Sequence, residues 1–232
     1  MTERGMIFNG EMVRALLSGR KTQTRRIMKV QPKPSKSRPG DFWFSSKKLE
    51  SMVHVSDLAP GNSPIADYHL FIQEHCCPFG AVGDRIWVRE TFCPVDDTQY
   101  GGEKWVDYRA TPRYEASHPA GWDSAPNDAE ALKWRPSIHM PRWASRILLE
   151  ITDVRVERLN AISEEDATAE GIPPAGSLLP DYPGTFLTPK GDFATAKVAF
   201  QRLWESIYGE ESWNANPWVW VIEFKRVEGS AA

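Results

Sequence analysis

The segment that most limits the fold of this chain is Trp218–Phe224, with the sequence WVWVIEF. Aromatic and β-branched residues favour strands, and here the segment is apolar on both faces. A strand of this kind must be covered on both sides, so we expect it to lie buried in the middle of a sheet. Because strands this apolar would attract other chains at an open edge, we expect the sheet to close into a small β-barrel with short helices against its openings.

The remaining elements are predicted from residue spacing and from capping residues. Helix patterns cover three segments. The first begins after Asn9 or Gly10 and ends at Gly19, the second runs from Ser163 to Gly171, and the third runs from Asp192 to Gly209. Strand patterns cover 22–28, 83–92 and 146–159. The last of them is broken near Thr152 and Asp153, which predicts a bent strand or a tight hairpin. The elements are short and follow no β-α-β rhythm, which favours a mixed α+β fold.

The chain of 232 residues is long enough for one domain with large insertions. Three segments lack clear periodicity and are rich in proline or in polar residues. We therefore expect a single domain over 1–232, with insertions at about 31–75, 94–134 and 173–190. The first insertion is expected to be irregular from Asp41 to His75. Short strands are expected in the second, around Trp105 and Tyr108.

Composition and cysteine usage indicate the compartment. Hydrophobic residues make up 41% and charged residues 25% of the chain, as in a globular protein. No apolar run approaches the roughly 20 residues that span a bilayer, and the first residues lack the apolar region of a secretory signal. Three cysteines, two of them adjacent at Cys76 and Cys77, do not make a disulfide framework. We therefore expect a cytoplasmic protein with no membrane partner.

Positive charge is concentrated in one segment. From Arg14 to Arg38 there are nine Lys or Arg residues and no Asp or Glu, whereas the rest of the chain contains 19 basic and 31 acidic residues. This distribution favours local capture of a phosphate or another polar anion over binding of a long duplex along a broad basic face. A run of charges is usually a solvated surface, so its residues need further support before they are treated as a site.

The order of several motifs resembles one known family. A short helix leads into Gly19-x-Lys21-x-x-Thr24-x-Arg26, a Gly-Asp strand follows, and the chain later contains ISEEDATAEG at 162–171. With the closing strand, these motifs resemble the ASCH domain of the PUA-like superfamily. The segments most similar to phage- or prophage-encoded members are WVRETF at 87–92, PSIHMPRWASR at 136–146 and NPWVWVIEF at 216–224. The resemblance covers most of the chain outside the three insertions and implies a PUA-like β-barrel with flanking short helices.

The resemblance also implies a function. ASCH domains are associated with RNA and with modified nucleosides as partners, and no cofactor is implied. One branch, small bacterial enzymes of this fold, is similar at its catalytic motif to Lys21 and Thr24, and its essential glutamate matches Glu170. Those enzymes are amidohydrolases that remove the acetyl group from 4-acetylcytidine. The resemblance therefore implies a hydrolase of a non-peptide amide bond with Lys21, Thr24 and Glu170 as catalytic residues, although this chain is more than twice as long.

Two mechanisms fit these three side chains. In one, Thr24 is the nucleophile and Lys21 activates it, which requires burial and neighbouring cations to lower the pKa of the lysine. In the other, Lys21 and Glu170 activate water while Thr24 orients the substrate. In either case Arg26 or a backbone amide can stabilise the oxyanion. Because alternate residues of a strand point to opposite faces, Lys21 and Thr24 can converge only if Lys21 lies in the turn before the strand.

Further residues are candidates for substrate contacts. The cations beside the motif are Arg20, Arg25 and Arg26. Trp143, in a non-periodic segment, is the best candidate to stack on a base. We expect no metal site, because the adjacent cysteines lack the spacing of a chelating turn.

Two other functions remain open at this point. A non-catalytic RNA-binding module would use the cations from Arg14 to Arg38, and a ribonuclease would use an overlapping basic site. The modest total of basic residues disfavours the module, whereas the Lys-Thr-Glu set favours catalysis. The insertion at 94–134 suits a lid or a protein-binding surface.

Overall fold

A five-stranded sheet forms the centre of the protein. The computed structural model describes residues 1–96, 98, 102–113 and 133–227. In spatial order the strands of the central sheet are β1 (Glu3–Ile7), β6 (Arg85–Arg89), β9 (Leu148–Arg158), β12 (Trp218–Arg226) and β2 (Gln23–Ile27). The β1–β6 pair is parallel and the other three pairs are antiparallel. The predicted buried strand is confirmed, because β12 lies between β9 and β2 and only Glu223 of its first seven residues is not buried.

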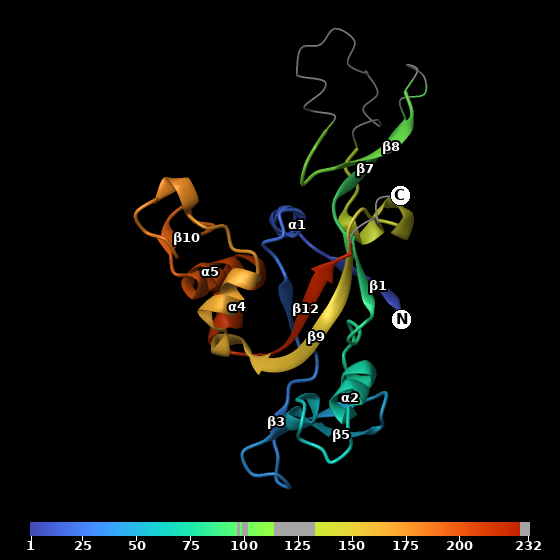
Figure 1. Ribbon diagram of the computed structural model, residues 1–232, viewed down its shortest axis with the longest axis vertical. Coiled ribbons are helices and arrows are strands. Elements are labelled where there is room, and N and C mark those ends of the chain that lie inside the picture. Colours follow the sequence, from blue (N-terminus) through green and yellow to red (C-terminus); the bar gives the residue numbers. More distant parts are fainter. Residues whose placement is uncertain (97, 99–101, 114–132, 228–232) are drawn as a thin grey trace.

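The long strand β9 is continuous but irregular at one point. Its register with β12 shifts so that Asp153 pairs with Glu223 and Ile151 with Phe224, which leaves Thr152 as an extra residue. An extra residue in one strand bends it and increases its twist. The predicted break near Thr152 is therefore a bulge in one bent strand, and both β9 and β12 curve across the molecule in Figure 1.

The two outer strands of the sheet approach each other. The mixed α+β prediction is confirmed, but the sheet is open, and no closed barrel is detected in the part of the chain that the structure describes. The outer strands are β1 and β2. Arg26 of β2 donates a hydrogen bond from Nη2 to the backbone carbonyl of Ile7 in β1, at 2.8 Å. One side chain therefore spans the gap between the two edge strands, which are not paired by backbone hydrogen bonds in the described sheet.

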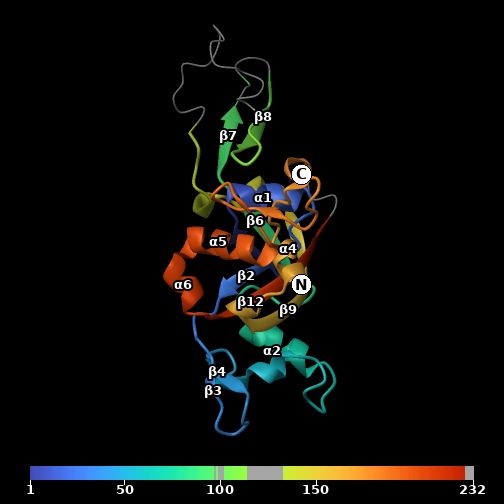
Figure 2. The same ribbon diagram turned by 90° about the vertical axis from the view of Figure 1, so that its left-hand side faces the viewer.

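Helices cover the two faces of this sheet. The α-helices are α1 (Gly10–Leu17), α2 (Tyr68–Cys76), α4 (Glu164–Ala169), α5 (Ala196–Tyr208) and α6 (Glu210–Asn214). One face of β12, with Val219 and Val221, packs against α4, α5 and α6. The other face, with Trp220 and Ile222, packs against α1 and the 31–75 segment. Figures 1 and 2 show α4 and α5 beside β12. Among the described helices, none combines the length and apolarity needed to cross a membrane.

The ends of three helices test the capping predictions. Asn9 caps α1, since its side-chain oxygen accepts the N–H of Met12 at 2.8 Å, and Ser163 caps α4 by accepting the N–H of Asp166 at 3.1 Å. The predicted cap of α5 is wrong. That helix begins after Thr195, and Asp192 instead accepts hydrogen bonds from the side chains of Thr188 and Arg202.

The expected insertions contain more structure than their sequences indicate. The first holds a three-stranded sheet, β3 (Lys33–Pro34), β4 (Phe42–Ser46) and β5 (Ser51–His54), together with α2. The prediction that Asp41–His75 is irregular is therefore wrong. These strands are ordered by tertiary packing, because Phe42 lies 4.9 Å from Trp218 and Phe44 lies 6.1 Å from Trp220 between ring centroids. Patterns of two to five residues are too short to signal this alone.

The other two insertions contain short hairpins. The second begins with β7 (Phe92–Asp96) and β8 (Lys104–Tyr108), which confirms the strands expected around Trp105 and Tyr108. The remainder of that prediction, at 114–132, lies outside the described residues. The third contains β10 (Phe186–Leu187), which pairs with β11 (Phe193–Ala194) just beyond the predicted end of the insertion at 190. Short 3-10 helices occur at Val55–Leu58, Ser137–His139, Arg142–Ala144, Leu159–Ala161 and Gly176–Leu178. In both views β7 and β8 project at the opposite end of the molecule from α2 and β3.

Candidate functional site

Lys21 lies in the turn between α1 and β2, as convergence with Thr24 requires. Gly19 adopts a positive φ of 74° after the helix, and the backbone N–H of Lys21 returns to the carbonyl of Ala15 at 3.1 Å. The end of α4 packs tightly against this turn. A Cβ at Gly171, where φ is 90°, would lie 2.8 Å from the Cβ atoms of both Lys21 and Ala15. Glycine at 171 therefore allows the end of α4 to reach Lys21.

Lys21 and Glu170 form a buried ion pair. Lys21 Nζ lies 2.8 Å from Glu170 Oε2 and 2.9 Å from the Glu170 backbone oxygen. The two side chains are 0% and 3% exposed. Burial lowers the pKa of the Lys21 amine below its usual value of 10.5, and this effect outweighs the opposing charge of Glu170. Arg25 and Arg26 lower the same pKa further by repulsion.

Arg25 holds the second oxygen of the glutamate. Its guanidinium donates from Nη1 to Glu170 Oε1 at 3.2 Å, and from Nη2 to Asp166 at 2.7 Å and Glu157 at 3.2 Å. Burial of Asp166 raises its pKa, but Arg25 and Arg155 together hold this pKa below its usual value. The carboxylate of Glu170 is thus fixed at both oxygens, by an amine on one side and a guanidinium on the other.

Thr24 shares a small cavity with Glu170. The cavity has a volume of about 20 Å³ and lies at the outer edge of β2, between α1 and α5. Besides these two residues it is lined by Met12, Arg25, Arg26, Phe200, Leu203, Trp204, Ile207 and Tyr208. Thr24 and Arg25 point to opposite faces of β2, but at an edge strand side chains of both faces can line one space. This volume is enough for about one water molecule.

The remaining predicted site residues lie at varied positions. Arg20 donates to the backbone oxygen of Gly171 at 3.2 Å, and Arg26 lines the cavity while bridging to β1. Trp143 is 69% exposed and is not among the residues lining this cavity. The structure therefore brings Lys21 against Glu170 and places Glu170 with Thr24 on one cavity, whereas Lys21 and Trp143 are not among the residues that line it.

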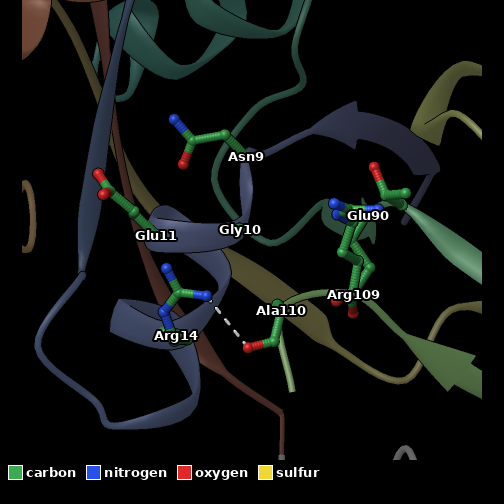
Figure 3. A pocket seen from close by; sticks show the side chains of 8 residues that line it. Asn9, Gly10, Glu11, Arg14, Glu90, Arg109 and Ala110 are labelled. Carbon is green, nitrogen blue, oxygen red and sulfur yellow. Dashed lines mark hydrogen bonds between the residues drawn. The ribbon is translucent and has the colours of Figure 1, made fainter. Parts of the chain in front are cut away.

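A larger cavity lies at the other end of α1. Its volume is about 350 Å³, and Figure 3 shows the residues that line it, which are Asn9, Gly10, Glu11, Arg14, Glu90, Thr91, Arg109 and Ala110. Glu90 is buried, and Arg146 donates to its two oxygens from Nε at 2.9 Å and from Nη2 at 3.0 Å. Burial raises the pKa of Glu90, and Arg146 opposes this rise. Sequence reasoning missed this site. The available signal was Glu90 itself, a carboxylate on the face that strand alternation assigns to Ile86 and Val88.

A third polar cluster lies in the 31–75 segment and was not predicted. Ser35 Oγ lies 2.9 Å from His54 Nε2, and His54 Nδ1 lies 3.9 Å from Asp57 Oδ2. These residue types occur in hydrolase triads, but a separation of 3.9 Å is too long for a hydrogen bond. Ser35 Oγ also accepts the backbone N–H of Arg38 at 3.1 Å. We therefore assign the cluster a structural role in connecting β3, β5 and the following 3-10 helix.

The cysteines have the properties of packed thiols. Cys76, Cys77 and Cys93 form no disulfide bond with one another. Burial raises the pKa of the Cys77 thiol to about 12, which keeps it protonated and makes it a poor metal ligand. Within the described residues, no group of three or more His, Cys, Asp or Glu side chains is arranged to hold a metal ion.

Comparisons with known proteins assign no family. The chain matches no protein-family model, no curated protein and no solved structure. The functional interpretation therefore depends on the geometry around Lys21 and on the motifs that resemble the ASCH domain.

Proposed function

We propose that this protein is an ASCH-type protein that hydrolyses an acylated cytidine-type amide. In this proposal the open sheet bridged by Arg26 corresponds to a PUA-like barrel, with the added segments at its ends. The observation that carries the proposal is the contact between Lys21 and Glu170, buried at 2.8 Å beside a cavity that Thr24 also lines. These are the three side chains that the motif resemblance implies, and they come from segments about 150 residues apart in the chain.

The geometry favours the mechanism in which water is the nucleophile. Lys21 Nζ is engaged by Glu170, and the cavity beside Glu170 and Thr24 has room for about one water molecule. Glu170 takes a proton from water as its oxygen attacks the amide carbon. Lys21 gives a proton to the departing amine as the C–N bond breaks. The proton on Glu170 then returns to Lys21 across their hydrogen bond, so the pair is restored and the products are a carboxylic acid and the free amine.

The substrate must displace part of α5 to reach these groups. A nucleobase is larger than the 20 Å³ cavity, and Leu203, Ile207 and Tyr208 of α5 cover it. Ile207 is 42% and Tyr208 39% exposed. The end of α5 is therefore less firmly packed than its middle and is the part that we expect to move. Closure around a bound substrate would exclude bulk water from the reacting bond.

The contacts of four cations in the basic segment favour catalysis over an RNA-binding module. Lys21 and Arg25 are buried against carboxylates, while Arg20 and Arg26 each donate to a backbone oxygen. Cations held in this way contribute little to a free phosphate-binding face. These four residues are therefore better suited to arranging Glu170 and its surroundings than to tracking a nucleic-acid backbone.

The test is release of cytidine from 4-acetylcytidine by the purified protein. We expect Lys21→Met and Glu170→Gln to reduce the rate by roughly 100-fold or more, the usual scale for losing an acid–base group. Lys29→Met and Glu165→Gln are matched controls, because both residues are exposed and should leave the rate unchanged. A wild-type protein that is inert but binds RNA with a steep salt dependence would support the module instead. RNA cleavage lost in the two site variants would support a ribonuclease.

A further experiment separates the two mechanisms. Thr24→Val keeps the shape of the side chain but removes the hydroxyl. If Thr24 only orients the substrate, this variant should keep measurable activity with a raised KM. If Thr24 is the nucleophile, the variant should be inactive, and the wild type should accumulate an acyl-enzyme in a single turnover that mass spectrometry detects on Thr24.

A further inference from the structure

The cavity of about 350 Å³ at the amino end of α1 has no role in the proposed chemistry. It lies between the first turn of α1 and the base of the β7–β8 hairpin (Figure 3). It shares no lining residue with the small cavity beside Glu170. Its volume is in the range of pockets that bind small molecules, roughly 300–1,000 Å³. It is therefore a separate space large enough for a ligand group.

Two arginines with unused donors line this cavity. In the described parts of the chain, neither Arg14 nor Arg109 forms an ion pair. Arg14 donates from Nη1 to the backbone oxygen of Ala110 at 3.1 Å, which fixes its guanidinium across the cavity. The guanidinium of Arg109 lies 5.7 Å from the ring centre of Trp134. Each guanidinium has five N–H donors, so most of them remain available to a ligand.

The carboxylates that line the cavity do not cancel the positive charge of Arg14 and Arg109. Glu90 is already neutralised by its two hydrogen bonds with Arg146, at 2.9 and 3.0 Å. Glu11 is exposed and is the one lining carboxylate that has no arginine partner within the described residues. Arg14 and Arg109 together therefore leave the lining with an excess positive charge. Planar guanidinium groups match the oxygen geometry of phosphate, which makes a phosphate group the best-fitting anion.

The position of the cavity limits what the ligand can be. It adjoins the first turn of α1, whereas the turn that carries Lys21 follows the last. Eight helical residues at 1.5 Å each separate the two places by roughly 12 Å. A ligand that occupies both must therefore be larger than one nucleoside. We propose that this cavity binds a backbone phosphate of an RNA strand whose acylated base is at the Lys21–Glu170 site, so that the substrate is RNA rather than a free nucleoside. This inference rests on the proposed function.

Binding of a short, unacylated, cytidine-containing oligoribonucleotide tests the phosphate site without any need for hydrolysis. Fluorescence anisotropy would measure its Kd against salt concentration. We expect Arg14→Gln and Arg109→Gln each to weaken binding about tenfold and to reduce the salt slope by about one. Arg226→Gln, which changes an exposed arginine outside the cavity lining, should leave both values unchanged. Unchanged Kd values in both cavity variants would overturn the inference.

A second variant blocks the cavity without changing its charge. A Cβ at Gly10 would lie 3.6 Å from the Arg14 guanidinium and 4.0 Å from the Ala110 methyl group, so a side chain can enter there without a clash. Gly10→Leu should therefore weaken oligonucleotide binding while the protein stays folded. Cytidine monophosphate added as a competitor should be far weaker than the oligonucleotide. Equal competition would show that the site takes a mononucleotide, which contradicts the RNA assignment.

Kinetics separate this inference from the proposed function. With an acylated oligonucleotide, Arg14→Gln should raise KM about tenfold, whereas the rate with free 4-acetylcytidine should stay as in the wild type. If no substrate is deacylated but oligonucleotide binding still depends on both arginines, the phosphate site stands and the hydrolase proposal fails. If deacylation occurs equally well on the free nucleoside and the oligonucleotide, the hydrolase stands and the phosphate site fails.

Discussion

Lys21 Nζ lies 2.8 Å from Glu170 Oε2, and neither side chain is more than 3% exposed. Two charges withdrawn from water to this extent lose a large hydration energy, which their attraction offsets only while both are present. Arg25 is a third member of this group, because it donates a hydrogen bond to the other oxygen of Glu170 at 3.2 Å. Each member of this group therefore depends on the others, and removal of a single member leaves a buried charge with incomplete compensation.

The first prediction concerns the stability of this pair. Lys21→Met and Glu170→Gln should each lower the free energy of unfolding by about 3 kcal/mol, the usual scale for breaking a buried pair. The double variant should cost at least about 1 kcal/mol less than the sum of the two single changes, since it removes both charges together. Urea unfolding curves of the four proteins would measure this. Additive losses would show that the two residues are not coupled.

The second prediction follows from the lowered pKa of Lys21. Because the folded protein holds this amine at a pKa below 10.5, the unfolded chain binds more protons in the alkaline range below that value. The free energy of unfolding should therefore rise with pH in this range, up to the lysine pKa of the unfolded chain. Subtracting the curve of Lys21→Met from that of the wild type isolates the contribution of this group. A difference that falls as the pH rises would contradict the lowered pKa.

The third prediction concerns the acidic partner of Arg25. The pKa of Asp166 is lowered in the folded state below its usual value of 3.8, so its ionised form stabilises the fold above that pH. This contribution should be lost as the pH falls from 3.8 toward the folded pKa. Asp166→Asn should remove that part of the acid dependence, whereas Glu165→Gln, at an exposed neighbour, should not. Thermal melting points measured through the acid range would show the difference.

Local signals made several elements predictable from the sequence. The strand at Trp218–Phe224 is apolar on both faces, and Asn9 and Ser163 are capping residues placed directly before helical spacing. The turn that contains Lys21 follows from a glycine between a helix pattern and a strand pattern. In each case the deciding interactions lie within a few residues of one another, so the sequence displays them.

The parts that escaped prediction depend on contacts between distant segments. The strands around Phe42 and Phe44 are ordered by packing on Trp218 and Trp220, which lie more than 170 residues away along the chain. The sequence analysis predicts Arg25 to contact the substrate. In the structure three carboxylates surround its guanidinium, one of them on β9 and two on or at the end of α4. No local pattern could reveal that those acids face β2.

The last prediction tests how closely α4 must approach Lys21. Gly171 and Gly209 both follow helices, with φ values of 90° and 86°, so alanine is strained at either position. At Gly209, where ψ is 155°, nothing lies within 4 Å of an added Cβ, and we expect Gly209→Ala to cost at least about 1 kcal/mol from backbone strain alone. At Gly171 the Cβ would lie 2.8 Å from those of Ala15 and Lys21, both held by the buried core. Overpacking adds about 1–3 kcal/mol to the backbone strain there, so Gly171→Ala should cost at least about 2 kcal/mol.

The same substitution should also disturb the chemistry. A shift of α4 by a few tenths of an ångström or more moves Glu170, the residue directly before Gly171, away from Lys21 and Arg25. Gly171→Ala should therefore reduce deacylation much more than Gly209→Ala does, when each is assayed at a temperature where it is fully folded. The two glycines have similar positive φ values and differ in what surrounds them. Equal effects of the two alanines on both stability and activity would mean that the close contact between α4 and the Lys21 turn does not position Glu170.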